Sequence, residues 1–158
     1  MINMQDSSVK IASIIMASMG VFTLVISLLW IFMTEVGFIS DFEAYTGTTF
    51  ADYLVSSPKY AEMYIIAKRL IGVQMFPISI LIILIAQKSY SKAQKWSWYA
   101  LLITGAILWG SILVYRISIG YFSFDTPLRA SSSMTPIVGL ILLIIGLTLP
   151  AKTFSGKR

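Results

Sequence analysis

Four long, uncharged apolar stretches constrain what this 158-residue chain can fold into. They are residues Ile11–Met33, Leu70–Ala86, Trp96–Tyr115 and Met134–Ala151, and none of them contains Asp, Glu, Lys or Arg. An α-helix of roughly 17 to 25 residues crosses the ~30 Å hydrocarbon core of a bilayer. The stretches therefore predict four transmembrane helices and leave little sequence for a soluble domain.

The composition agrees with this prediction and excludes several kinds of chemistry. Hydrophobic residues make up 57% of the chain and charged residues 12%, against roughly 25% charged residues in soluble domains. The chain contains no Cys, which excludes disulfides and thiol chemistry, and no His, the commonest acid-base group near neutral pH and the commonest metal ligand. We therefore expect no metal site and no cofactor.

The basic residues follow a pattern that predicts membrane topology. One side of the membrane would hold Lys10, Lys88, Lys92, Lys95, Lys152, Lys157 and Arg158, and the other Lys59 and Arg129 in loops and Lys68, Arg69 and Arg116 at helix ends. Because basic loops stay in the cytoplasm, we expect a multi-pass protein of the cytoplasmic (plasma) membrane with both termini inside. The net charge of +5 is thus explained by topology, and we expect no nucleic-acid partner.

The segment between the first two apolar stretches carries signals for short helices. Two patterns resemble capping boxes, Ser40 with Glu43 and Thr49 with Asp52, and Gly47 lies between them. Ser57 before Pro58 resembles an N-cap followed by proline at the first helical position. The segment thus predicts a small helical cap on the extracytoplasmic side.

The predicted fold is an all-α, polytopic four-transmembrane-helix bundle that forms a single membrane domain over residues 1–158. The predicted helices cover about 11–33, 58–87, 96–119 and 134–151, with the cap at 34–57. Trp96, Trp98 and Tyr99 follow the basic hairpin and mark the inner boundary of the third helix, because amphipathic rings favour the headgroup level.

Counting along the helices predicts a cationic layer at the outer interface. Lys68 is twenty residues before Lys88, and Arg116 is twenty residues after Trp96, which is ~30 Å at helical rise. Together with Arg69 these cations would lie beneath a loop region that holds five of the seven acids, namely Glu35, Asp41, Glu43, Asp52 and Glu62.

This layer admits several interpretations. In the simplest, the cations reach the headgroups and Glu35, Asp41, Glu43 and Glu62 form structural ion pairs with them, a loop carboxylate being the partner expected for Arg69. In a second, Lys68, Arg69 and Arg116 recognise a phosphate or carboxylate in a pocket walled by Tyr64, Tyr115 and Tyr121.

Two further alternatives use the loop acids. Asp41 and Glu43 are candidates for general acid-base work in an enzyme that modifies lipids of the outer leaflet. Asp41, Glu43 and Asp52 are hard oxygen ligands that suit Ca²⁺, although their spacing matches no calcium loop. For Asp41 and Glu43, stabilising the first turn of a helix is the simpler role.

One stretch resembles a known kind of protein. Lys92, Ala93, Gln94, Lys95, Trp96, Ser97, Trp98, Tyr99, Ala100 and Leu101 resemble the junction between basic loop and aromatic helix in small, uncharacterised prokaryotic four-helix membrane proteins. The resemblance implies an architecture and no activity. The absence of Cys separates the chain from vitamin K epoxide reductases, tetraspanins and claudins.

The sequence shows no nucleophile-base set, nucleotide motif or ionisable residue at mid-membrane. We therefore expect a non-enzymatic accessory or scaffold subunit of a larger membrane complex, for example of respiratory or membrane-oxygenase type. Its expected partners are membrane lipids and other integral membrane subunits or a second copy. The alternative is a lipid- or anion-binding protein or small carrier that uses the cationic layer.

Overall fold

The computed structural model describes residues 4–122, 124 and 127–155, without the side chains of 4–6, 35–38, 40, 127–129, 131 and 155. Over these residues the chain is helical and contains no strand. The helices are α1 Met4–Phe32, α2 Thr34–Thr46, α3 Phe50–Ser56, α4 Pro58–Lys88, the 3-10 helix η1 Tyr90–Lys92, α5 Lys95–Ser118, α6 Pro127–Thr148 and α7 Ala151–Ser155.

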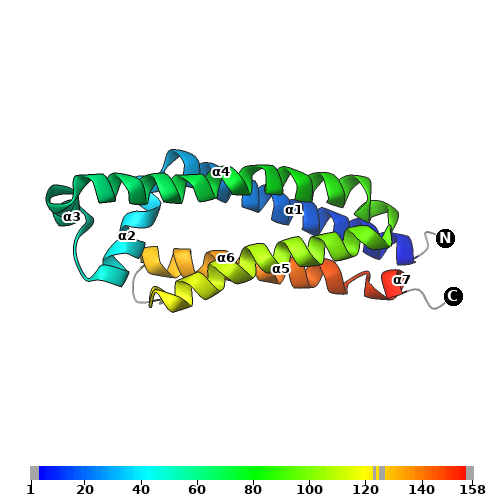
Figure 1. The fold of residues 1–158 in the computed structure, drawn as a ribbon. Coiled ribbons are helices and arrows are strands. Elements are labelled where there is room, and N and C mark those ends of the chain that lie inside the picture. Colours follow the sequence, from blue (N-terminus) through cyan, green and yellow to red (C-terminus); the bar gives the residue numbers. More distant parts are fainter. Residues whose placement is uncertain (1–3, 123, 125–126, 156–158) are drawn as a thin grey trace.

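The four long helices form two layers that run along the same direction (Figure 1). Helices α1 and α4 make one layer, α5 and α6 make the other, and α1 also packs on α6. Both termini lie at one end of this bundle, which we call the terminal end, and α2 and α3 lie at the opposite end, the cap end (Figure 1). At the cap end α4 extends past α5 and α6 and carries α3, while α2 crosses from one layer toward the other.

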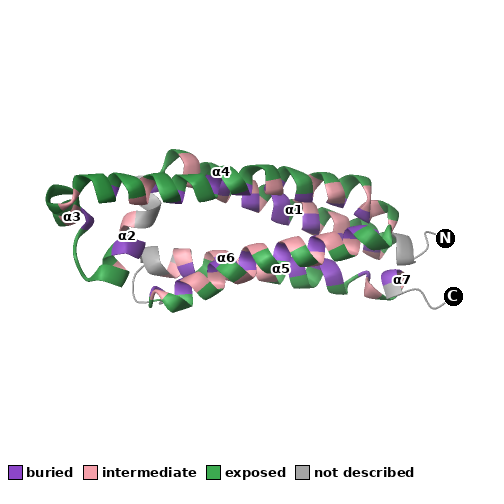
Figure 2. Cartoon of the chain, in the orientation of Figure 1, coloured by how far each residue is buried: buried purple, intermediate pink, exposed green. Residues whose placement is uncertain are grey.

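Three helical segments are long and apolar enough to cross a membrane, namely Ser7–Phe32, Pro58–Lys92 and Lys95–Ser118. The described apolar part of α6, Ser132–Thr148, is shorter. Exposed residues follow the outward faces of the long helices and buried residues lie where the helices meet (Figure 2). Many outward residues are large and apolar, including Ile14, Leu81 and Ile107, as expected for faces in contact with lipid.

Small residues let the helices approach closely. A Cβ atom on Gly139 of α6 would lie 2.1 Å from Cδ2 of Trp109 on α5, so only glycine fits there. The Trp109 ring is fully buried and stacks on Phe22 of α1, with ring centroids 5.3 Å apart. Between α1 and α4, Ser27 Oγ donates a hydrogen bond to Gly72 O at 3.2 Å. The interior of the bundle is thus packed by large side chains against small ones.

The structure confirms part of the local structure predicted for the cap segment. Thr49 is the N-cap of α3, and its side chain accepts a hydrogen bond from Asp52 N at 3.1 Å, as the capping box predicts. Gly47 ends α2 in the left-handed conformation, with φ 71°. The capping box predicted at Ser40 is wrong, because α2 begins at Thr34 and runs through this position.

The second and fourth predicted helices differ from the structure in detail. Helix α4 begins at Pro58 as expected, but the Ser57 side chain makes no capping hydrogen bond. The helix predicted over 134–151 begins earlier, at Pro127, and ends at Thr148. Proline is favoured in the first turn because its missing amide has no partner there, and Pro150 disfavours continuation beyond Leu149.

Candidate functional site

A buried ion pair joins the cap to the long helices of the bundle. Arg116 Nη1 lies 2.5 Å from Asp41 Oδ1, and the two residues are only 5% and 1% exposed. Asp41 comes from the middle of α2 and Arg116 from the last turn of α5. The crossing of α2 over the bundle therefore places a carboxylate on a helix end that is 75 residues away in sequence.

The end of α5 is shaped to hold this arginine. Gly120 has φ 67° and its N–H donates to Ile117 O at 3.1 Å, while Tyr121 N–H donates to Arg116 O at 3.0 Å. These two bonds form a Schellman motif, which turns the chain back over the last helical turn. The buried Tyr121 ring then lies 4.8 Å from the Arg116 guanidinium carbon. The aromatic face stabilises the cation at a site that excludes water.

Lys68 of α4 is the second buried cation of this region. Its ammonium donates a hydrogen bond to the Tyr115 hydroxyl and lies 4.2 Å from the centroid of the Tyr115 ring. The Tyr64 ring lies 5.3 Å from the same ammonium. We call Asp41, Lys68, Arg116, Tyr115 and Tyr121 the buried polar layer. It connects α2, α4 and α5 at the cap end.

The electrostatics of the buried polar layer are dominated by burial. Loss of hydration raises the pKa of the Asp41 carboxyl, and the nearby charges of Arg116 and Lys68 oppose this rise. Asp41 Oδ2 and Arg116 Nε are buried and make no hydrogen bond with the described residues. Such an incompletely satisfied pair contributes little net stability but is costly to break on one side.

Arg69 lies apart from the other predicted ligand-binding residues. It is exposed and lines a groove of about 730 Å³ between α2, α3 and α4, which we call the cap groove. The other residues of the groove are Ile39, Glu43, Phe50, Ala51, Leu54, Ala61, Glu62, Ile65 and Ile66. The groove therefore has mainly apolar walls, with one cation and two acids.

The predicted site residues thus fall into two groups. Lys68, Arg116 and Tyr115 belong to the buried polar layer, whereas Arg69, Glu43 and Glu62 line the cap groove. Tyr64 lies between them, because its ring contacts the Lys68 ammonium and also packs on Phe42, with ring centroids 5.4 Å apart. The side chain of Glu35 lies outside the described residues.

The loop acids have separate local roles. Glu43 Oε1 accepts a hydrogen bond from Phe50 N at the start of α3, at 3.2 Å, and Asp52 accepts one from the Thr49 hydroxyl at 2.6 Å. Within the part of the chain that the structure describes, no group of three or more metal-ligating residues is close enough to hold an ion. The Ca²⁺ alternative therefore has no geometric support among these residues.

Sequence reasoning missed two features of this region. It counted Asp41 among the acids that pair with the cations but did not identify Arg116 as its partner, and it expected a loop carboxylate on Arg69. It also missed an apolar cluster beneath the cap groove, in which Phe42, Phe50 and Ala61 are buried. The spacing of Ile39, Phe42 and Thr46 is that of one helix face and could have indicated this cluster. It can be recognised only when α2 is known to begin at Thr34.

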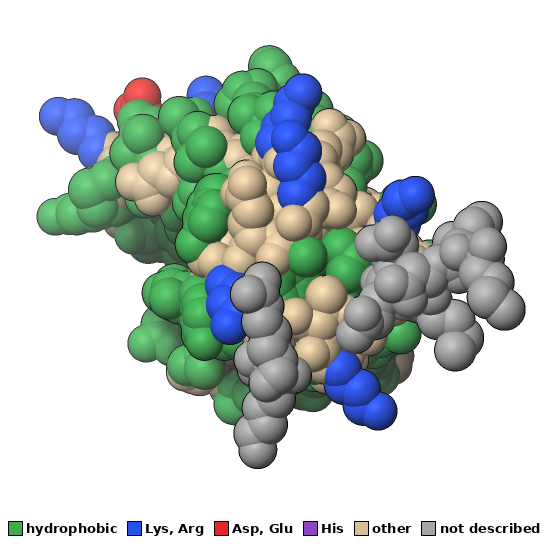
Figure 3. All heavy atoms as spheres, turned by 90° about the vertical axis from the view of Figure 1, so that its right-hand side faces the viewer, with side chains coloured by type: hydrophobic (Ala, Val, Ile, Leu, Met, Phe, Trp, Pro, Cys, Tyr) green, Lys and Arg blue, Asp and Glu red, His purple; other side chains and the backbone are tan. Residues whose placement is uncertain are grey.

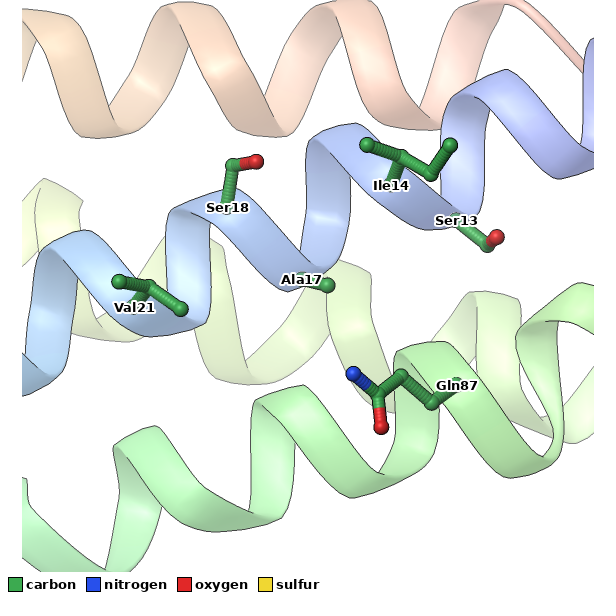
Figure 4. Close-up of a pocket in the computed structure, with 6 residues that line it drawn as sticks. All are labelled: Ser13, Ile14, Ala17, Ser18, Val21 and Gln87. Atoms are coloured by element: carbon green, nitrogen blue, oxygen red, sulfur yellow. The ribbon is translucent and has the colours of Figure 1, made fainter.

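A second hollow, of about 350 Å³, lies between α1 and α4 toward the terminal end. It is lined by Ser13, Ile14, Ala17, Ser18, Val21 and Gln87, and the Gln87 carboxamide extends from α4 toward α1 (Figure 4). Among the described residues no charged side chain lines it, and the Ser13 hydroxyl already donates to Lys10 O at 2.9 Å. It is therefore no counterpart of the predicted anion site.

No protein-family model, curated protein or solved structure matches the chain. The resemblance of residues 92–101 to small four-helix membrane proteins stays a prediction. The apolar helices themselves are consistent with a small membrane protein.

Proposed function

We propose that this protein is a non-enzymatic integral membrane protein that acts as an accessory or scaffold subunit of a larger membrane assembly. In this proposal α6 is the fourth span, because it packs on α5 along the bundle and its 22 residues correspond to ~33 Å of helix. The terminal end would face the cytoplasm, in accordance with the positions of the basic residues.

The observation that carries the proposal is that the buried charged groups of the cap end pair with one another or with a tyrosine, whereas its surface exposes large apolar side chains. Asp41 and Arg116 pair with each other and Lys68 bonds to Tyr115, so these groups hold α2, α4 and α5 together. Helix α3 and the first turns of α4 instead expose large apolar side chains, with Val55 85%, Tyr60 63% and Met63 60% exposed. Apolar patches of this kind are typical of surfaces that bind other proteins.

Purification from native membranes in mild detergent, with mass spectrometry of the co-migrating proteins, tests the proposal. We expect partner subunits in stoichiometric amounts. The double variant Val55→Ser/Tyr60→Ser should lose them, because two exposed apolar contacts are removed. Val114→Ser is the matched control, since Val114 is 62% exposed on the outward face of α5. A clean monomer or homo-oligomer from native membranes would contradict the accessory role.

The cap groove supports a second candidate function, the binding of an amphiphilic anion. Its volume of about 730 Å³ lies within the usual range of ligand pockets, roughly 300 to 1,000 Å³. Arg69 is an exposed cation in an apolar groove, and a guanidinium binds phosphate or carboxylate in a bidentate manner. This candidate retains Arg69 and omits Lys68 and Arg116, which are buried.

Titration with dodecyl phosphate, followed by native mass spectrometry, tests this second candidate. Arg69→Gln should weaken binding, whereas Lys59→Gln, another exposed cation of α4 that does not line the groove, should not. Equal binding to wild type and Arg69→Gln would exclude the groove as an anion site.

A further inference from the structure

A separate pocket lies at the terminal end, between the start of α5 and the short helix α7. It has a volume of about 210 Å³ and is lined by Lys95, Trp98, Tyr99, Ala151 and Phe154. We call it the terminal pocket. It combines one cation with three aromatic rings, and it shares no residue with the buried polar layer or the cap groove.

The walls of the terminal pocket are fixed by bonds to the rest of the bundle. Trp98 Nε1 donates a hydrogen bond to Leu147 O at 3.1 Å. The Phe154 ring stacks on Tyr90, with centroids 4.9 Å apart, and the Tyr90 hydroxyl donates to Gly146 O at 2.6 Å. The pocket is therefore formed in advance, so a ligand need not order the aromatic side chains on binding.

Lys95 is the free cation of this pocket. It is exposed and, within the described part of the chain, makes no hydrogen bond or ion pair. Lys152 is also exposed and lies on α7 next to Ala151. The described part of the terminal end is basic, with lysine side chains spread over its face (Figure 3). This positive potential favours an anionic ligand.

The position of the terminal pocket indicates where that ligand comes from. Lys95 begins α5, and the segment from Lys95 to Ser118 is apolar enough to cross a membrane. The pocket therefore lies where this span enters the headgroup region, the level that Trp and Tyr prefer. At this level the available anions with an apolar part are phospholipids of the adjacent leaflet, and the aromatic side chains of the pocket suit that apolar part.

We propose that the terminal pocket binds one anionic phospholipid. The Lys95 ammonium contacts the phosphate as a point charge, and the Trp98, Tyr99 and Phe154 rings contact the glycerol and the first part of the acyl chains. Basic pockets between transmembrane helices are known to bind anionic headgroups. A zwitterionic lipid is disfavoured, because its own cation competes for the phosphate and is repelled by the basic face.

The test places the protein in nanodiscs of equimolar phosphatidylglycerol and phosphatidylcholine and measures by native mass spectrometry which lipids stay bound after release. We expect one retained phosphatidylglycerol per chain. Lys95→Gln should lower its retention about fivefold, the effect of roughly one basic residue near an anionic headgroup. Ala151→Phe should also lower it, because the new ring fills the pocket without a change of charge.

Two controls separate the terminal pocket from general charge and from the cap groove. Lys88→Gln removes an exposed lysine of the same end that does not line the pocket, and Arg69→Gln removes the cation of the cap groove. Neither variant should change the retention. Equal losses in Lys88→Gln and Lys95→Gln, no preference for phosphatidylglycerol in the wild type, or displacement of the lipid by inorganic phosphate would overturn the proposal. If Ala151→Phe does not fold, the loss of phosphatidylglycerol retention in Lys95→Gln, a change at an exposed residue, still tests the proposal.

Discussion

At the scale of single residues, the most constrained side chains are Asp41 and Arg116. Each charge is the other's partner at a buried site, although Asp41 Oδ2 and Arg116 Nε make no hydrogen bond with the described residues, and Arg116 also lies against the Tyr121 ring. The two partners are not equivalent, because burial raises the pKa of the Asp41 carboxyl, which can take up a proton when it is unpaired, whereas an arginine keeps its charge. Removal of the negative charge, which leaves the guanidinium buried without a counter-charge, should consequently cost more than removal of the cation.

This difference predicts unequal effects of two substitutions. Asp41→Asn leaves the Arg116 guanidinium buried without its counter-charge and should destabilise the protein by about 3 to 5 kcal/mol. Arg116→Gln should cost only about 1 to 2 kcal/mol, because the unpaired Asp41 carboxyl can take up a proton. The double variant should be more stable than the sum of both losses predicts. Thermal unfolding in micelles measures all three, with the exposed Arg69→Gln as control.

The raised pKa of Asp41 predicts a pH dependence. The folded protein holds this proton to a higher pH than the unfolded chain, whose pKa is near the ordinary 3.8. Between these two pKa values the folded state binds more protons, so its stability falls as pH rises, and it is constant above the folded pKa. Wild type should therefore lose stability relative to Asp41→Asn as pH rises from 3.8. A constant difference between the two proteins in unfolding experiments at several pH values would contradict the shift.

At the scale of helices, the structure distinguishes glycines that are needed for close contact between two helices from glycines that are not. Gly139 lies against the ring of Trp109, whereas a Cβ on Gly110 of α5 would meet nothing within 4 Å. Both glycines occupy helical positions. Whether a glycine can be replaced by alanine without loss of stability therefore depends on whether a facing helix touches it.

Gly139→Ala and Gly110→Ala should therefore have opposite effects. The new methyl group at Gly139 forces α6 away from α5 and should cost about 1 to 3 kcal/mol. At Gly110 the same change should be neutral or stabilise the helix by up to about 1 kcal/mol, because alanine is the better helix former. The melting temperatures of the two variants, monitored by circular dichroism, measure this difference. Equal melting temperatures would show that the α5–α6 contact is looser than described.

At the scale of the whole molecule, the bundle has two chemically different ends. The terminal end is basic and carries the terminal pocket, whereas the cap end carries the buried polar layer, the cap groove and the apolar surface of α3. The apolar outward faces of the long helices lie between them. This arrangement suits a protein whose two ends lie on opposite sides of one membrane.

Labelling of single cysteines tests this arrangement directly, because the chain contains no native Cys. Ser91 lies in η1 at the terminal end, and the exposed Thr48 lies between α2 and α3 at the cap end. In oriented vesicles, an impermeant maleimide should label Cys introduced at these two positions from opposite sides. Labelling of both from the same side would contradict the predicted topology and the placement of Lys68 and Arg116 at the outer interface.

The sequence by itself determined the helical class, the apolar segments and several local breaks. These features depend on neighbouring residues: uncharged runs, the hydroxyl of Thr49 and the left-handed Gly47 act within one or two helical turns. Even the common height of Lys68 and Arg116 follows from counting residues along two helices.

Only the tertiary structure decided which residues meet. The crossing of α2 pairs Asp41 with Arg116, 75 residues away. The packing of α5 and of the cap against α4 gives the adjacent Lys68 and Arg69 different surroundings, one buried beside Tyr115 and one in the cap groove. The rotation of each helix about its axis and the path of α2 result from packing between distant segments. Local sequence does not encode these relations, because each depends on the shape of the surface that the other helices present.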